Sequence, residues 1–235
     1  MLKLLTTVVL LLCPALADAI SADQIMANAR YASTLNDIEF KGQLKHGRDR
    51  TDVTLKMLRN DIQLYYEKNN ATHGMRLVLQ QDSCSLFAIS PTGQLTQFPE
   101  SQVGASIEGT DFTYEDLSLR FLYWDQAHLL REESVKTQKC YVLRAENPGK
   151  SGNYKYVDLW IHKDAFALMK MQAYDAQGNH IKTMEASDLM NVNDKIMMKK
   201  MKVMTIAGGK TSSYSYLILQ NPEGIKKSAR PRKLR

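Results

Sequence analysis

The chain is poor in cysteine and has no long apolar segment beyond its first residues. Three cysteines occur in 235 residues. Because Cys13 falls in the leader described below, at most one disulfide can form in the remainder. No apolar run after residue 19 approaches the roughly 20 residues needed to cross a bilayer. We therefore expect the rest of the chain to be soluble.

Motifs that carry chemistry are also missing. The five histidines are scattered and show no metal-ligand spacing. There is no Gly-x-Ser-x-Gly elbow, no phosphate-binding glycine loop and no dinucleotide fingerprint. The adjacent Glu115 and Asp116 are typical of a first helical turn rather than of an acid–base pair. We expect no cofactor, no metal and no enzymatic activity. A lipid-modifying hydrolase is the least supported alternative, because no activated nucleophile is visible.

The formal net charge of +6 is concentrated at the end of the chain. From Lys226 to Arg235 there are six basic and no acidic side chains, so the rest is formally neutral. A nucleic-acid-binding domain would spread basic charge over one face, and we expect no nucleic-acid partner. The basic tail, residues 223–235, is either a solvated end or a peripheral contact with anionic lipid head groups.

Residues 1–19 have the pattern of a secretory signal peptide. Lys3 precedes the apolar run Leu4–Leu12, and Ala17 and Ala19 supply the small residues that a signal peptidase recognises. The run is too short to span a bilayer, although an uncleaved anchor is the alternative. We expect cleavage after Ala19 and a periplasmic protein.

Cys84 and Cys140 are the two cysteines that remain after cleavage. In an oxidising compartment two cysteines favour one disulfide. This disulfide would close a loop of more than fifty residues. In the chain-entropy model, closing such a loop stabilises the protein by about 4 kcal/mol. We expect this disulfide, and two buried free thiols are the alternative.

Two segments have the spacing of helices. Ser21 and Gln24 form a capping box, so residues 22–35 are expected to be an amphipathic helix. A second helical spacing runs from Tyr114 to Trp124, after a loop punctuated by prolines and glycines.

Most of the remaining chain alternates apolar and polar residues with a period of two, between turns rich in Asn, Asp and Gly. No long linker divides it. Residues 20–222 are therefore expected to form one α+β domain, built on a large curved antiparallel sheet. About ten strands are expected, at residues 53–58, 64–68, 76–81, 84–89, 140–142, 154–161, 167–174, 180–188, 196–206 and 212–220.

A curved sheet covered by only two helical segments leaves an apolar hollow on its concave face. Hollows of this kind bind lipids and other hydrophobic ligands. Methionine is concentrated in the C-terminal third of the chain. Its flexible thioethers suit an adaptable binding surface, or alternatively fill gaps in an ordinary core.

The segment from Glu108 to Leu117, EGTDFTYEDL, resembles a motif of bacterial outer-membrane lipoprotein-sorting proteins, a family similar to the periplasmic lipoprotein carrier. Residues 156–161 and 174–182 agree with the same family, so the resemblance covers most of the mature chain. It implies a half-open β-barrel closed by a helical lid, whose hydrophobic cavity accepts acyl chains. Within the motif, Asp111 or Thr113 is expected to cap the lid helix, Asp116 to lie in its first turn, and Gly109 to permit a close approach.

The residues expected to contact lipid are large apolar and aromatic side chains of the strands and the lid. The alternation of a strand does not show which of its faces lines the cavity when both faces are apolar. The candidates are Leu55, Met57, Leu64, Tyr66, Leu77, Leu79, Leu86, Phe112, Leu117, Phe121, Trp160 and Met171.

The leading functional hypothesis is a non-catalytic periplasmic carrier that binds the acyl chains of lipoproteins or lipids for outer-membrane sorting. Such a carrier would exchange cargo with an inner-membrane donor and an outer-membrane acceptor. The alternative is a periplasmic sensor that binds a lipid or lipoprotein and regulates a membrane protein, because a fold does not fix a function. Exchangeable cargo favours the carrier, and a persistent complex with one membrane protein favours the sensor.

Overall fold

The computed structural model describes residues 20–33, 37–149, 151–193 and 195–222. The expected signal peptide and basic tail lie outside this part of the chain. In the described residues no helix has the length and apolar character needed to cross a membrane.

One antiparallel sheet of thirteen strands contains most of the described chain. Its strands are β1 (Ile38–His46), β2 (Asp49–Leu58), β3 (Asp61–Lys68), β4 (Ala71–Leu79), β5 (Cys84–Ile89), β6 (Leu95–Gln97), β7 (Gln126–Val135), β8 (Gln138–Glu146), β9 (Tyr156–His162), β10 (Leu168–Tyr174), β11 (His180–Val192), β12 (Lys195–Ala207) and β13 (Lys210–Leu219). The helical elements are α1 (Ala22–Ala32), the 3-10 turn η1 (Glu100–Gln102), α2 (Tyr114–Ser118) and the 3-10 turn η2 (Arg120–Tyr123).

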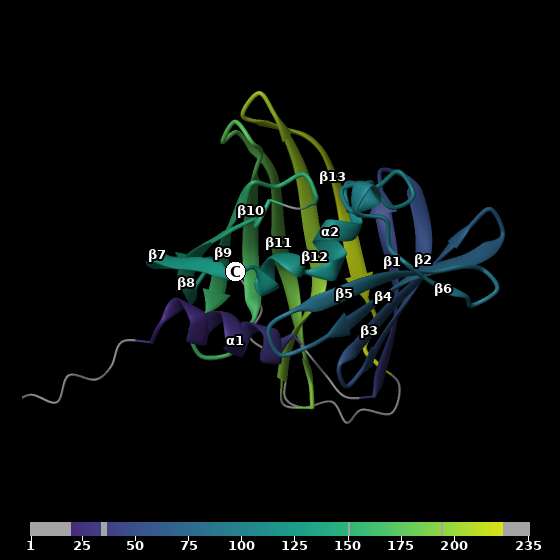
Figure 1. Ribbon diagram of the computed structural model, residues 1–235, viewed down its shortest axis with the longest axis horizontal. Helices are drawn as coiled ribbons and strands as arrows, with labels where there is room; N and C mark the ends of the chain where they lie inside the picture. Colours follow the sequence, from purple (N-terminus) through teal and green to yellow (C-terminus); the bar gives the residue numbers. More distant parts are fainter. Residues whose placement is uncertain (1–19, 34–36, 150, 194, 223–235) are drawn as a thin grey trace, which may run out of the picture.

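The order of the strands shows how the sheet is assembled. It runs β6-β5-β4-β3-β2-β1-β13-β12-β11-β10-β9-β8-β7, so neighbours in the sheet are neighbours in the chain except at the pairing of β1 with β13. That pairing joins two meanders into one surface, and β6 and β7 remain as unpaired edges. Figure 1 shows the sheet bent around α2, with α1 crossing one end of the left half. The expected fold class, a large curved antiparallel sheet with an N-terminal helix and a mid-chain helical segment, is confirmed.

Three of the thirteen strands were not expected from the sequence. β1 alternates buried and exposed residues, but Gly42 interrupts its apolar pattern. The glycine is required because a Cβ there would lie 2.5 Å from the carbonyl oxygen of Ile218 on β13. β7 is an edge strand with nearly all of its residues exposed, and β6 has three residues, all exposed. Neither therefore carries a hydrophobic period.

The two expected helices differ in how closely they follow the pattern. α1 begins with the expected capping box between Ser21 and Gln24 and ends at Ala32. The mid-chain segment is broken, because Leu119 adopts a left-handed conformation with φ of 49° between α2 and η2. A single helix from Tyr114 to Trp124 is therefore replaced by two short pieces.

The expected disulfide is absent, and Cys84 and Cys140 are free thiols. They lie on β5 and β8, which stand near opposite edges of the sheet order. Burial raises the pKa of each thiol to about 11. The alternative of two free thiols therefore describes this structure.

Candidate ligand cavity

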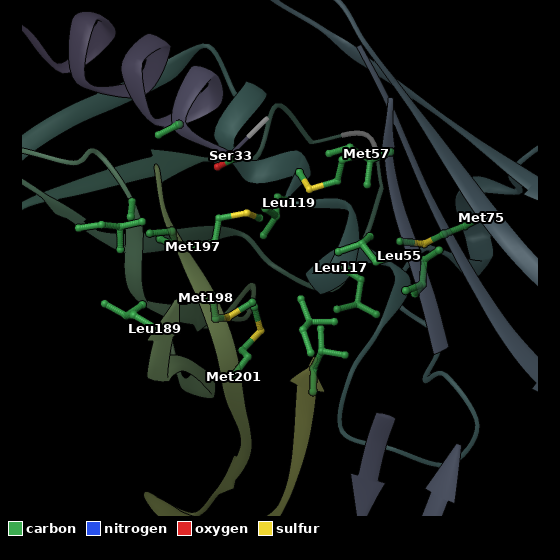
Figure 2. A pocket seen from close by; sticks show the side chains of 18 residues that line it. Ser33, Leu55, Met57, Met75, Leu117, Leu119, Leu189, Met197, Met198 and Met201 are labelled. Carbon is green, nitrogen blue, oxygen red and sulfur yellow. The ribbon is translucent and has the colours of Figure 1, made fainter. Parts of the chain in front are cut away.

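An apolar cavity of about 140 Å³ lies between the concave side of the sheet and the helical segments. α1 contributes Ala32 to its wall, α2 and the link to η2 contribute Leu117 and Leu119, and seven strands supply most of the rest. Figure 2 shows the side chains of β12 facing those of β2 and β4 across the space. Among the described residues of the lining, Ser33 has the only polar side chain. The full lining is Ala32, Ser33, Leu55, Met57, Ile62, Leu64, Met75, Leu117, Leu119, Ala167, Leu168, Leu189, Ile196, Met197, Met198, Met201, Leu217 and Leu219.

Methionine forms an unusual share of this wall. Met57 and Met75 lie on one side, and Met197, Met198 and Met201 of β12 lie on the other (Figure 2). A methionine side chain is unbranched and changes rotamer easily, so its surface adapts to ligands of different shape. The wall is therefore suited to a flexible apolar guest.

Four of the twelve candidate lipid contacts line the cavity, and eight do not. Leu55, Met57, Leu64 and Leu117 are in the lining. Seven others are packed in the main hydrophobic core, away from the cavity surface: Tyr66, Leu77, Leu79, Leu86, Phe112, Phe121 and Met171.

Trp160 is the eighth candidate outside the cavity, and it lies on the other face of the sheet. Its neighbours on β9, Leu159 and Ile161, are in the main core, whereas Trp160 packs with Cys140 and Met169 in a separate cluster. Successive residues of a strand point to opposite faces. The ring of Trp160 therefore points away from the face of the sheet that carries the cavity.

Arg30 ties the last turn of α1 to the helical segment. Its guanidinium donates a hydrogen bond of 3.0 Å to the carbonyl oxygen of Leu122 and lies 5.4 Å from the ring centroid of Tyr123. It also lies 3.6 Å from the carboxylate of Asp82 in the turn between β4 and β5. Arg30 therefore links α1 to η2, two elements that cover the hollow.

The helix α2 is fixed at its start by a second capping box. Thr113 is the N-cap, and its hydroxyl accepts a hydrogen bond from the backbone N–H of Asp116, whose carboxylate accepts the N–H of Thr113 in return. Thr113 therefore has the capping role, and Asp111 does not. Gly109 has φ of 67°, and a Cβ there would meet nothing within 4 Å. It supplies backbone conformation rather than the expected close approach.

A buried ion pair connects this capping box to the sheet. The ammonium of Lys182 on β11 lies 2.7 Å from Oδ2 of Asp116, and it also donates to the carbonyl oxygen of Asp111 at 2.9 Å. The hydroxyl of Tyr154 donates to the other oxygen of Asp116 at 2.6 Å. The Asp116 side chain is completely buried, and its carboxylate charge is compensated by one cation and several hydrogen bonds.

Asp111, two residues before the N-cap Thr113, forms a second polar attachment to the sheet. Its carboxylate accepts hydrogen bonds from the hydroxyls of Thr205, Ser213 and Ser215 and lies 3.2 Å from Nδ1 of His46. Burial alone would raise the pKa of Asp111. The three hydroxyls and the charge of His46 outweigh burial, so the pKa is lowered. The motif is therefore anchored to β1, β12 and β13.

The partners of Asp111 and Asp116 were missed in the sequence, although a signal for them exists. Lys182, Thr205 and Ser215 each have a buried apolar residue two positions away on the same strand, namely Met184, Val203 and Leu217. A polar side chain on an inward-facing strand position needs a buried partner. The acidic residues of the motif are those partners.

Glu115 is also buried, and it takes part in no salt bridge within the part of the chain that the structure describes. One of its carboxylate oxygens accepts the backbone N–H of Asn153 at 2.9 Å. Burial raises the pKa of Glu115 to about 7, and the hydrogen bond from Asn153 opposes that rise.

Several solved structures have a similar fold. A putative outer-membrane lipoprotein-sorting protein domain from Vibrio parahaemolyticus has a TM-score of 0.68 at 15% identity, with 89% of this chain and 94% of that chain covered. A LolA-superfamily protein from Nitrosomonas europaea has a TM-score of 0.64 at 17% identity, with 91% and 96% covered. A DUF1329 family protein from Desulfovibrio piger has a TM-score of 0.67 at 15% identity, with 86% and 90% covered.

These likenesses establish a LolA-like fold, and the resemblance seen in the sequence is confirmed at that level. A model of a family of uncharacterized proteins matches residues 76–228, and the chain belongs to that family. No curated protein matches the sequence.

The buried pair predicts a large loss of stability when its cation is removed. In Lys182→Met the carboxylate of Asp116 stays buried without its positive partner, and we expect unfolding to become easier by about 3 kcal/mol. Urea denaturation followed by circular dichroism measures this change. Lys199→Met is the matched control, because Lys199 lies 3.6 Å from Asp188 in an exposed pair and should cost less than about 1 kcal/mol. Equal effects of the two substitutions would contradict the assigned role of Lys182.

The raised pKa of Glu115 predicts a stability that falls with pH. The folded state holds this proton up to about pH 7, whereas an ordinary glutamate with a pKa of 4.5 has released it. The stabilisation is full below the unfolded pKa and is lost as the pH rises through the folded pKa. We expect the melting temperature of the parent protein to fall relative to that of Glu115→Gln between about pH 5 and pH 8. Parallel melting curves at every pH would refute the assignment.

Proposed function

We propose that the protein is a non-catalytic periplasmic carrier that binds the acyl chains of lipoproteins or lipids for outer-membrane sorting. The observation that carries the proposal is the cavity whose lining, among the described residues, is apolar except for Ser33. The LolA-like fold supports it, since solved proteins with this fold include a putative lipoprotein-sorting domain. A binding role is favoured over catalysis because a single hydroxyl is the only polar side-chain group in the lining.

The driving force for binding is burial of acyl methylenes, worth about 0.8 kcal/mol each. The cavity has about the volume of an engineered apolar cavity of about 150 Å³ that binds benzene in another protein. It therefore accommodates part of a long acyl chain in the state described here. Movement of α1 and of the methionine side chains would admit the rest, and the contacts of Arg30 are those that must break.

The remaining parts of the proposal concern delivery and exchange. The leader that ends at Ala19 would direct the chain to the periplasm. An inner-membrane donor and an outer-membrane acceptor would load and unload the cavity. The basic tail, residues 223–235, would hold the carrier near anionic head groups while cargo is exchanged.

Filling the cavity should abolish acyl binding without unfolding the protein. In Leu55→Trp the indole occupies the space between β2 and β12, and we expect affinity for a fluorescent fatty-acid probe to fall by at least about tenfold, or 1.4 kcal/mol. Fluorescence titration of the purified mature protein measures the change.

Leu58→Trp is the control on the same strand. Leu58 is 38% exposed and lies outside the cavity lining, so the same substitution should leave probe affinity unchanged. Circular dichroism confirms that both variants are folded. Undiminished binding by a folded Leu55→Trp variant would show that the probe binds elsewhere.

A further inference from the structure

A second cleft, with a volume of about 630 Å³, lies beside the apolar cavity at the C-terminal end of α1. The two spaces have Ala32 of α1 and Ile196 of β12 in common. In the turn between β9 and β10, Phe166 lines the cleft and the next residue, Ala167, lines the cavity. Figure 1 shows the end of α1 close to the end of the sheet where β12 begins. The cleft therefore adjoins the cavity at this end.

The chemistry changes abruptly between the two spaces. The cavity has one hydroxyl in its lining, whereas the cleft is lined by an ammonium, a carboxylate, amides and an imidazole. An apolar space that adjoins a polar one has the form required by an amphiphile, whose tail is buried and whose head stays hydrated.

Two polar groups of the cleft, His162 and Gln138, hold the fold. Nε2 of His162 lies 2.9 Å from the side-chain oxygen of Gln138, and Nδ1 accepts the backbone N–H groups of Asp164 and Ala165. These contacts hold the turn between β9 and β10 in place. His162 and Gln138 are therefore positioning groups for that turn.

Other polar groups of the cleft face the space from opposite elements. Lys195 begins β12, and its ammonium lies 4.3 Å from the ring centroid of Tyr31, a residue of α1 that is 71% exposed. Asp164 belongs to the β9–β10 turn and Asn28 to α1. Among the described residues, these three elements thus bring a cation, an anion and an amide to the cleft.

We propose that this cleft is the headgroup site of the acyl ligand, and that it is selective for a zwitterionic head. Lys195 and Asn28 bind the oxyanion or carbonyl oxygens of the head, and Asp164 binds its ammonium. Phosphatidylethanolamine has this chemistry, and a diacylglyceryl-cysteinyl peptide with a free amino terminus presents the same ammonium beside ester and amide carbonyl oxygens. The inference rests on the proposed function, because it places the tail of the same ligand in the apolar cavity.

The test compares ligands that share tails and differ in the head. The mature protein is titrated with dioctanoyl phosphatidylethanolamine, with dioctanoylglycerol, which lacks a charged head, and with a diacylglyceryl-cysteinyl peptide. Lys195→Gln and Asp164→Asn should each weaken binding of the zwitterionic lipid about tenfold. Neither should change the affinity for dioctanoylglycerol. Lys195→Arg should retain most of the affinity, and Lys41→Gln, at an exposed site on β1, is the control.

The outcomes separate this inference from the function on which it rests. If the parent protein binds both lipids and the cleft variants leave the zwitterionic lipid unaffected, the headgroup site is wrong and the carrier stands. If the parent protein binds neither lipid, the proposed function fails and the headgroup site fails with it. If the variants weaken only the lipopeptide, or only the phospholipid, the site is supported and the source of the head is identified.

Discussion

The buried contact between Lys182 and Asp116 is the interaction on which the site depends. It joins a five-residue helix, too short to be stable alone, to the central part of the sheet. Asp116 also completes the capping box with Thr113, so the same carboxylate fixes both the start of α2 and its place on β11. Leu117 and Leu119 follow directly, and they form the part of the cavity wall that the sheet cannot supply.

A second constraint is the pairing of β1 with β13. It joins the two meanders and leaves β6 and β7 as open edges, so the sheet bends without closing. The concave side must then be covered by something other than strands. α1 and the motif segment do this incompletely, and a cavity lined by flexible methionines remains. The same geometry places the polar cleft beside one end of that cavity.

The fold was largely predictable because its signals are local. The capping box at Ser21 and the period-two pattern of most strands are properties of short segments. β7 was not predicted because an exposed edge strand has no apolar period. β1 was not predicted because Gly42, which the nearby backbone of β13 requires, interrupts its apolar pattern. The site was predictable only in part. Leu55 and Trp160 are both large apolar residues of strands, and the sequence does not show which of them faces the cavity. The register of the strands sets the face that each side chain occupies. The pairing of Asp116 with Lys182 joins residues 66 apart in sequence.

The measurement that tests the central claim most directly is native mass spectrometry of the mature protein purified from the periplasm of the bacterium that makes it. Lipid extraction should follow. The account predicts a bound acylated species, phospholipid or lipopeptide, that a hydrophobic probe displaces. An empty protein that also fails to bind any acyl probe would contradict the claim that the cavity holds acyl chains.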